Sequence, residues 1–283
     1  MRFTVRVPAT SANLGPGFDC FGLALDLCNE VTFDTHAEPA ITWEGEGADE
    51  LPIDGSDLIL ETMRRVAAGR ALPAFRLHGL NRVPLARGFG SSSAAVVAGV
   101  VAALTLLGSE PTPTAVFPLA AAIEGHPDNA APACCGGFTI ALPGGSVHRF
   151  DPHPDVRPVL LVPDLRGSTV EARAALPDLV PRADAVFNAA HAALMVRALT
   201  DDPGLLGDAL RDRIHQDVRL ALVPPVAEVF RALRDDGVPV CVSGAGPALL
   251  AFEGGDAVAD PGDGWRVLRP GVRRGGFESD SGS

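Results

Sequence analysis

Residues 84–95 read "PLARGFGSSSAA": a proline, a glycine pair, three serines and then alanines that open an apolar run. Gly88 and Gly90 permit positive φ, which lets backbone N–H groups converge on one point. Ser91 is expected to cap the following helix, whose first N–H groups carry partial positive charge. Such a turn before a helix suits an anion, above all a phosphate. The stretch therefore predicts a phosphate-binding loop followed by a helix.

The loop has no ammonium group to offer, because the chain contains no lysine and all 23 basic residues are arginines. This excludes the nucleotide loop that ends in lysine, and the GxGxxG fingerprint is also absent. The loop must rely on backbone amides, serine hydroxyls and a divalent cation. Hydroxyl oxygens suit Mg²⁺, which often bridges substrate phosphates. The residues alone favour a nucleotide phosphate with Mg²⁺, and an ordinary capped helix is the alternative.

Hydrophobic periodicity along the chain predicts an α+β fold with two lobes. The expected strands span residues 3–8, 31–33, 74–80, 136–142, 158–164 and 238–242. The expected helices span 57–69, 91–107, a segment ending near residue 124, and two or three stretches within 183–235. Apolar residues occupy every face of 91–107, so this helix is expected to be central and buried. Residues 9–27 are expected to be a loop, 126–132 a polar turn and 273–283 a frayed tail.

Residues 143–158, "PGGSVHRFDPHPDVRP", cluster proline, glycine and histidine and mark the best domain boundary. We therefore expect an N-terminal lobe over residues 1–153, which binds the nucleotide, and a C-terminal lobe over residues 154–283.

Composition narrows the classes of protein. Apolar residues make up 47% and charged residues 20%, as in ordinary globular proteins. The net charge of −12 speaks against general binding to nucleic acid or anionic membranes, which needs a basic face. The five cysteines show no CxxC pair and are expected to be reduced, buried thiols. With no signal-peptide pattern, a cytoplasmic location is expected.

Two further stretches carry polar residues suited to a ligand. Residues 9–22, "ATSANLGPGFDCFG", set Asn13 and Asp19 among small residues and glycines. Residues 124–132, "EGHPDNAAP", place Glu124 close to Asp128 and Asn129. A carboxylate beside a phosphate loop can complete the ligand shell of Mg²⁺. Each stretch taken singly also fits an ordinary turn, where Asp and Asn are common.

Five stretches together resemble the GHMP small-molecule kinases and, among them, the homoserine kinase family. They are "VPATSANLGPGFDCFGLAL" (7–25), "VPLARGFGSSSAA" (83–95), "EGHPDNAAPACCGGF" (124–138), "STVEARAALP" (168–177) and "VSGAGPALLAF" (242–252). The phosphate loop identifies the superfamily alone, whereas the combination with "SANLGPGFD", "HPDNAAP" and "STVEAR" is far more specific.

The resemblance implies an N-terminal lobe like the second domain of ribosomal protein S5, a ferredoxin-like C-terminal lobe and an active site between them. It implies transfer of the ATP γ-phosphate to the side-chain hydroxyl of L-homoserine, giving O-phospho-L-homoserine for threonine biosynthesis. The alternatives are a GHMP kinase that acts on another small alcohol and a non-catalytic sensor on the same fold. The oligomeric state stays open, with a homodimer as one alternative.

The resemblance also implies a role for each motif. The nucleotide phosphates would lie against the loop residues Pro84, Leu85, Ala86, Arg87, Gly88, Phe89, Gly90, Ser91, Ser92, Ser93 and Ala94. Mg²⁺ would be bound by Ser92 and Glu124. The polar end and hydroxyl of the amino acid would be held by Asn13, Asp19 and Asn129. Its carboxylate would be gripped by Arg173 and Arg219, since an arginine fork meets a carboxylate with two hydrogen bonds.

The catalytic residues implied are Asn129, Thr169, near the transferred phosphate, and Arg173. Several relatives place an aspartate base where this chain has Asn129, and an amide is no useful proton acceptor. A mechanism without a strong protein base is therefore favoured, and Asp19 or Asp128 as the base is the alternative. Two departures concern nucleotide preference: Phe89 replaces a usual leucine or methionine, and Asp57 replaces an asparagine that lines the purine pocket.

Overall fold

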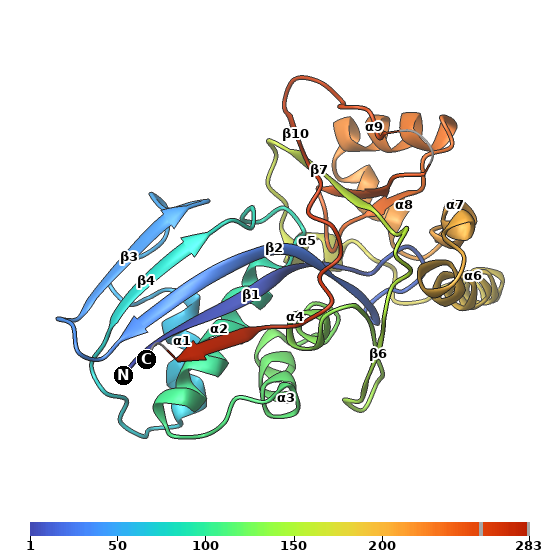
Figure 1. The fold of residues 1–283 in the computed structure, drawn as a ribbon. Coiled ribbons are helices and arrows are strands. Elements are labelled where there is room, and N and C mark those ends of the chain that lie inside the picture. The colour runs from blue at the N-terminus through green and yellow to red at the C-terminus, as the bar shows by residue number, and fades with distance from the viewer. Residues whose placement is uncertain (255–256, 282–283) are drawn as a thin grey trace.

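Two β-sheets organise the chain in the computed structural model, which describes residues 1–254 and 257–281 (Figure 1). The first sheet has the order β11-β1-β2-β4-β3, and β5 pairs with both β2 and β6. Only β3 and β4 run parallel among its described pairings. Its strands are β1 (Arg2–Ala12), β2 (Phe21–Asp34), β3 (Ala40–Gly45), β4 (Arg76–Asn81), β5 (Phe138–Ala141), β6 (Val147–Phe150) and β11 (Glu278–Ser281).

Four helices cover one face of the first sheet, as Figure 1 shows. They are α1 (Leu58–Ala67), α2 (Ser91–Leu106), α3 (Pro113–Glu124) and α4 (Ala130–Cys135). Helix α2 packs against α1, α3 and β1 and buries a continuous run from Val96 to Ala103. The prediction of a central, buried helix after the phosphate loop is confirmed.

The second sheet has the order β10-β7-β9-β8, with every described pair antiparallel. Its strands are β7 (Pro158–Pro163), β8 (Val240–Val242), β9 (Leu249–Phe252) and β10 (Trp265–Leu268). Numbered within this lobe, the order is 4-1-3-2, the ferredoxin-like arrangement that the resemblance implies. Between β9 and β10 the described residues contain no helix, so the second crossover helix of that arrangement is missing there.

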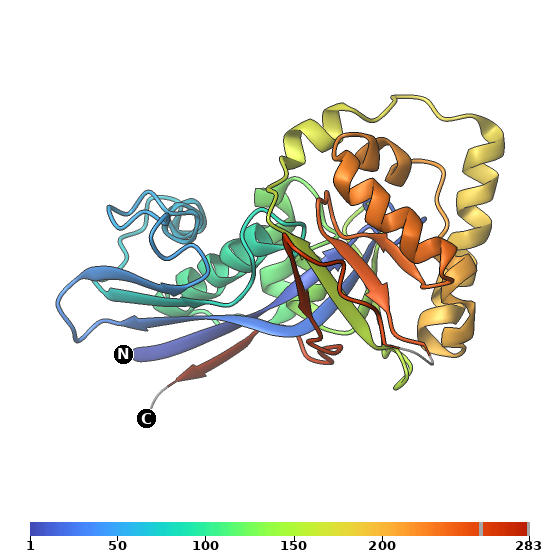
Figure 2. The same ribbon diagram turned by 90° about the horizontal axis from the view of Figure 1, so that it is seen from above.

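Helices lie between β7 and β8 in the second lobe. They are α5 (Thr169–Ala174), α6 (Arg182–Thr200), α7 (Leu206–Ala209), α8 (Gln216–Ala221) and α9 (Pro224–Asp235), with a 3₁₀ turn at Pro203–Leu205. The sequence predicted two or three helices within 183–235, and the structure divides this stretch into more, shorter pieces. Figure 2 shows the yellow segment from β7 to α6 running along the outer side of this lobe.

The two lobes share one of three apolar clusters. Leu23 and Phe89 from the first lobe pack in the same cluster as Leu160, Met195 and Phe252 from the second. The other two clusters lie within single lobes, one between the first sheet and its helices and one between β7–β9 and α9. The shared cluster fixes the relative position of the lobes, and with it the loops that both contribute to the site.

The expectation of a loop over 9–27 is wrong, because strands take up most of it. Strand β1 continues to Ala12 and β2 begins at Phe21, so the turn is confined to residues 13–20. Residues 7–12 and 21–25 are buried on both faces. A strand buried on both faces shows no alternation of polar and apolar residues. These strands are also rich in small residues and glycine, which are typical of turns, so the sequence alone favours a loop. The polar turn expected at 126–132 is also too long, since α4 begins at Ala130.

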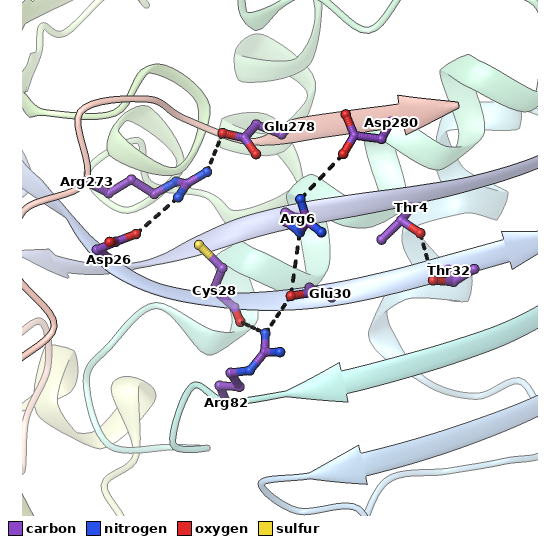
Figure 3. A network of polar contacts seen from close by, with 10 residues as sticks. All are labelled: Thr4, Arg6, Asp26, Cys28, Glu30, Thr32, Arg82, Arg273, Glu278 and Asp280. Carbon is purple, nitrogen blue, oxygen red and sulfur yellow. Dashed lines mark hydrogen bonds and ion pairs between the residues drawn. The ribbon is translucent and has the colours of Figure 1, made fainter. Parts of the chain in front are cut away.

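The expectation of a frayed tail is wrong for the described residues up to 281. Strand β11 pairs antiparallel with β1, with Arg6 opposite Glu278. Figure 3 shows the charged contacts that accompany this pairing: Arg273 bonds both Asp26 and Glu278, and Arg6 bonds Asp280. The last two residues lie outside the described part. The polar composition of the tail hid the strand because this sheet face is itself polar.

The division at residue 153 stays a prediction. The chain leaves the first sheet after β6 and enters the second with β7, on either side of that point. The last strand, however, returns to the first sheet beside β1. No sequence pattern indicated β3, β6, β9, β10 or α5, which are short or lie in stretches rich in glycine, proline or charge.

Candidate active site

Helix α2 begins directly after the glycine turn of the phosphate loop. Gly90 is its N-cap residue, with φ of 65°, and among the described residues no side chain caps this end. The expected cap by Ser91 is therefore wrong, because Ser91 is already the first helical residue. The first N–H groups are left for another partner, and the helix dipole favours an anion there.

The phosphate loop is held by the C-terminal glycine turn, residues 243–248. The Ser243 hydroxyl donates to the Gly88 carbonyl over 2.7 Å, and the Ala248 N–H donates to the Arg87 carbonyl over 3.2 Å. Gly88 has φ of 89°, and a Cβ placed on it would overlap the Ser243 carbonyl oxygen. Only glycine fits at this contact, so the motif near residue 245 fixes the shape of the loop near residue 88.

A cavity of about 260 Å³ lies between the two lobes beside this loop. It brings together ten of the predicted residues: Asn13, Ala86, Gly88, Gly90, Ser91, Ser92, Asn129, Thr169, Arg173 and Arg219. It also includes residues for which the sequence predicted no firm role: His126, Asp128, Gly167, Gly244, Ala245 and Gly246. Five of these lie within the quoted motifs, which could have indicated them, and Gly167 lies directly before the motif at 168–177. Segments far apart in sequence thus form one site.

The remaining predicted loop residues lie around the cavity. Ser93 and Phe89 are buried, Phe89 within the shared apolar cluster. Arg87 donates from Nε to the Pro163 carbonyl at the end of β7, over 2.9 Å. Leu85 and Ala94 line a second, smaller cavity beside the start of α2. Pro84 is buried and precedes the loop.

Glu124 faces two hydroxyls of the phosphate loop from the end of α3. The Ser92 hydroxyl donates to Glu124 Oε1 over 3.2 Å, and the Ser93 hydroxyl donates to Oε2. Burial raises the pKa of Glu124, and these hydrogen bonds and the nearby His126 oppose that effect. The predicted metal residues are thus adjacent, and they are oxygen donors of the kind that Mg²⁺ prefers. Within the described ranges, no group of three or more His, Cys, Asp or Glu side chains is arranged to hold a metal.

Asp128 and Asn129 start helix α4 at the wall of the cavity. Asp128 is 2% exposed and pairs with His126 at 2.9 Å. This hydrogen bond raises the pKa of His126, against the effect of burial. Asn129 accepts the hydroxyl proton of Thr10 over 2.8 Å through Oδ1. That bond orients the amide, so its NH₂ group is the part left to meet a ligand.

Arg173 and Asp19, both predicted to bind substrate, bind each other. Arg173 Nη1 and Nη2 donate to the two Asp19 oxygens over 2.8 and 2.7 Å, a bidentate pair. Asn13 holds the backbone of the same aspartate, because its Oδ1 accepts the Asp19 N–H over 3.0 Å. Both side chains are partly exposed, and Arg173 lines the cavity whereas Asp19 lies behind it in the ion pair. The sequence placed these residues in one site and did not predict their pairing.

Arg219 lies deeper, with only 5% of its surface exposed. Its Nη1 donates to the Gly244 carbonyl over 2.6 Å and contacts His215 Nδ1 at 3.1 Å. Its guanidinium lies 5.3 Å from the centroid of the Phe18 ring. Burial lowers the pKa of Arg219 to about 10, and the carboxylates of Asp128 and Asp19 oppose the effect. Arg219 is therefore a charged group fixed at the cavity wall.

The smaller cavity, of about 60 Å³, lies next to Ser91 and is mostly apolar. Asp57 lines it, and its Oδ1 caps α1 by accepting the Leu60 N–H over 3.0 Å. The second oxygen, Oδ2, is buried and has no hydrogen-bond partner among the described residues. Burial raises the pKa of Asp57. The position beside the phosphate loop fits the purine pocket that the resemblance implies.

Comparisons with known proteins agree with this architecture. The family models for the GHMP kinases N terminal domain and the GHMP kinases C terminal domain match residues 57–137 and 182–259. The chain belongs to the GHMP kinases, a class of phosphotransferases.

Within that class the relatives define a narrower group. The homoserine kinase of Cutibacterium acnes is 46% identical over 259 residues, which cover 88% of each chain. That of Clavibacter michiganensis is 44% identical over 260 residues, covering 89% of this chain and 82% of the relative. The crystal structure of homoserine kinase from Cytophaga hutchinsonii superposes with a TM-score of 0.84 at 26% identity, over 99% of this chain and 97% of the other. The chain belongs to the homoserine kinase family.

In the described part of the chain, no helix is both long and apolar enough to cross a bilayer.

Proposed function

We propose that the protein transfers the γ-phosphoryl group of ATP to the side-chain hydroxyl of L-homoserine and forms O-phospho-L-homoserine. The observation that carries the proposal is the Asp19–Arg173 pair at the cavity beside the phosphate loop. Homoserine bears an ammonium and a carboxylate, and this pair offers an opposite charge to each. Membership of the homoserine kinase family supports the same substrate.

The nucleotide phosphates bind at the start of α2 in this proposal. The N–H groups of the loop and of the first helical turn, which lack a side-chain cap among the described residues, donate to the phosphate oxygens. Their positions are set before ATP arrives, because the turn at 243–248 holds the loop. Preformed donors cost little reorganisation during the reaction.

Ser92 and Glu124 would hold Mg²⁺. Their oxygen atoms already lie together, and Glu124 is a partly buried carboxylate whose pKa burial raises. When bound, the ion supplies neutralisation of phosphate charge. The two residues fit this role by chemistry and by position next to the loop.

The amino acid binds by breaking the ion pair between Asp19 and Arg173 and pairing with both of these residues. Its carboxylate takes the fork of Arg173 and a free edge of Arg219, while its ammonium meets Asp19. Asn13 and Asn129 then orient the hydroxyl toward the phosphate loop, and Thr169 lies beside the transferred group. Positioning of this kind supplies most of the catalysis in phosphoryl transfer, where little covalent chemistry falls to the protein.

The hydroxyl proton passes to the phosphoryl group and not to a strong protein base. Asp128 pairs with His126 and also accepts the Asn129 N–H, and Asp19 pairs with Arg173. Both carboxylates are therefore already engaged, and in the proposed complex the substrate ammonium takes the place of Arg173 at Asp19. This favours the base-free mechanism over its alternative, in which Asp19 or Asp128 takes the proton.

We further predict that the protein acts in threonine biosynthesis, is located in the cytoplasm, binds no nucleic acid or membrane, and has two lobes that divide at residue 153. The oligomeric state, with a homodimer as one alternative, also stays a prediction. The two substrate arginines disfavour an alcohol without a carboxylate, and the intact loop and Glu124 disfavour a non-catalytic sensor.

An assay of ADP formation by the purified protein tests the function. With ATP and Mg²⁺, homoserine should support turnover, and mevalonate, galactose and shikimate should support it poorly. If mevalonate were turned over as fast as homoserine, the assignment of homoserine as the substrate would be wrong. If no alcohol supported turnover, the alternative of a non-catalytic sensor would be favoured.

A further inference from the structure

A chain of buried polar side chains runs from helix α6 to the active site. The Asn188 amide donates to Asp212 Oδ1 over 2.7 Å. Asp212 Oδ2 accepts the backbone N–H groups of His215 and Gln216, both over 2.8 Å. The side chains of Asp212 and His215 have no exposed surface. A buried network of this kind fixes the geometry of its members when each is satisfied.

The partners of His215 determine its tautomer. Nε2 lies 2.7 Å from the carbonyl oxygen of Gly15, which can only accept, so Nε2 carries the proton. Nδ1 lies 3.1 Å from Arg219 Nη1, which can only donate, so Nδ1 presents its lone pair. The ring is therefore neutral, and burial agrees by lowering the pKa of His215 to about 4.

This arrangement uses both hydrogens of Arg219 Nη1. One goes to His215 Nδ1 and the other to the Gly244 carbonyl. The other two guanidinium nitrogens have no protein partner among the described residues. A guanidinium is a rigid plane, so fixing Nη1 at two points sets the direction of Nη2. The same histidine holds Gly15, in the turn that carries Asn13 and Asp19.

We propose that His215 is a positioning residue, which acts through Arg219 and the 13–20 turn to set the homoserine side of the site. This rests on the proposed function, because it takes Arg219 to be a carboxylate ligand. Its Nδ1 lone pair aims Arg219, and its Nε2–H fixes the turn with Asp19. His215 therefore affects binding of the amino acid, whereas binding of the nucleotide depends on the phosphate loop.

Two substitutions separate the halves of this role. In His215→Asn, the Oδ1 atom takes the place of Nδ1 and can still accept from Arg219. In His215→Gln, the Nε2 group takes the place of the ring Nε2–H and can still donate to Gly15, but the acceptor for Arg219 is lost. We expect His215→Gln to raise the KM for homoserine by about 10-fold or more, the loss of one hydrogen bond to a charged group. His215→Asn should raise it by roughly threefold or less, and both should change the KM for ATP by less than about twofold.

The control is Leu233→Ala, a cavity variant in the cluster behind the second sheet. It loses stability without touching the site, so its two KM values should stay close to those of the parent. Equal homoserine KM values for His215→Asn and His215→Gln would overturn the proposal. So would a rise in both KM values in step with lost Tm, as expected of a structural residue.

A second measurement needs no turnover. Nitrogen-15 NMR of the histidine rings at pH 7 should assign His215 as the neutral Nε2–H tautomer, and an imidazolium or Nδ1–H tautomer would contradict the proposal. Absence of homoserine turnover by the parent protein would overturn the proposed function instead, so the two failures are distinguishable.

Discussion

Single side chains at this site carry charges that burial disfavours unless a ligand compensates them. Glu124 and Asp57 are carboxyls whose pKa values burial raises, and Arg219 is a guanidinium whose pKa burial lowers. Perturbed groups of this kind cluster where a protein binds charged ligands. The two carboxyls therefore allow a test by a nearly isosteric change to the amide.

Glu124→Gln should lower kcat by a factor on the order of 10², because a carboxylate that helps hold Mg²⁺ is lost at the transferred phosphate. Folding should survive, since the amide oxygen can still accept from Ser92 or Ser93. Steady-state kinetics across a Mg²⁺ titration measures the effect. Glu110→Gln, an exposed glutamate between α2 and α3, is the matched control. Normal turnover and normal Mg²⁺ dependence in Glu124→Gln would leave it a helix-end residue only.

Asp57→Asn should stabilise the protein at pH 7. The pKa of Asp57 is raised in the folded state, so its contribution to the free energy of unfolding is present in acid and is lost as pH rises through that pKa. The amide keeps the cap on Leu60 and removes the penalty. Asp54→Asn is the control, because hydrogen bonds from Ser56 lower the pKa of Asp54 and its removal gives no such gain. Urea unfolding at pH 3, below the ordinary pKa of an aspartate, and at pH 7 decides, and a gain no larger at pH 7 than at pH 3 would contradict the raised pKa of Asp57.

At the scale of elements, the site is a contact between a turn of one lobe and a loop of the other. Ser243 and Ala248 hold the loop at Arg87 and Gly88, and the Gly167 N–H bonds the Ala86 carbonyl over 3.0 Å. These backbone contacts set the phosphate loop before any ligand binds.

Gly88→Ala should raise the KM for ATP by about 10-fold or more, because its Cβ overlaps the Ser243 carbonyl and the loop must move. Gly108→Ala is the matched control, with φ of 76° and, among the described residues, nothing within 4 Å of an added Cβ. It bears the same kind of backbone strain without the overlap. If the two variants raised the KM for ATP alike, strain alone and not the contact with Ser243 would explain the effect.

The sequence predicted α1 from its apolar period, and α2 from the glycine turn and the long apolar run that follows it. It failed where burial is two-sided, as at Thr10 and Ser11, whose small polar side chains are fully buried in β1. It also failed for β11, whose charged residues pair across strands that are close only in the folded chain. The motifs brought the site residues together, but the Asp19–Arg173 pair joins positions 154 residues apart, and no local pattern reports such a contact.

At the scale of the whole molecule, two features join the lobes. One is the shared apolar cluster, and the other is the network of buried polar side chains that ends at Arg219. His215 is central to the second link, since it contacts the turn of the first lobe and α8 of the second. Its charge state therefore affects the stability of the whole fold.

Stability should fall in acid through His215. Its pKa is about 4 in the folded state against about 6.5 unfolded, so the unfolded chain binds more protons between these values. The contribution is fully present above about pH 6.5 and is lost toward pH 4, and the loss by pH 5 is about 2 kcal/mol. Urea unfolding of the parent and His215→Asn at pH 7.5 and pH 5 measures it. The parent should lose stability relative to the variant, and an unchanged difference would contradict the buried, neutral histidine.

In the proposed function, the substrate must supply both an ammonium and a carboxylate to replace the Asp19–Arg173 pair. The most direct measurement compares kcat/KM for L-homoserine with that for 4-hydroxybutanoate, which lacks the ammonium, and 3-aminopropan-1-ol, which lacks the carboxylate. Each analogue loses one charge-assisted contact with this partly exposed pair, at a cost of roughly 1.5–3 kcal/mol. We predict a loss of about 10-fold or more in kcat/KM for each analogue. Turnover of either analogue as efficient as that of homoserine would contradict the account.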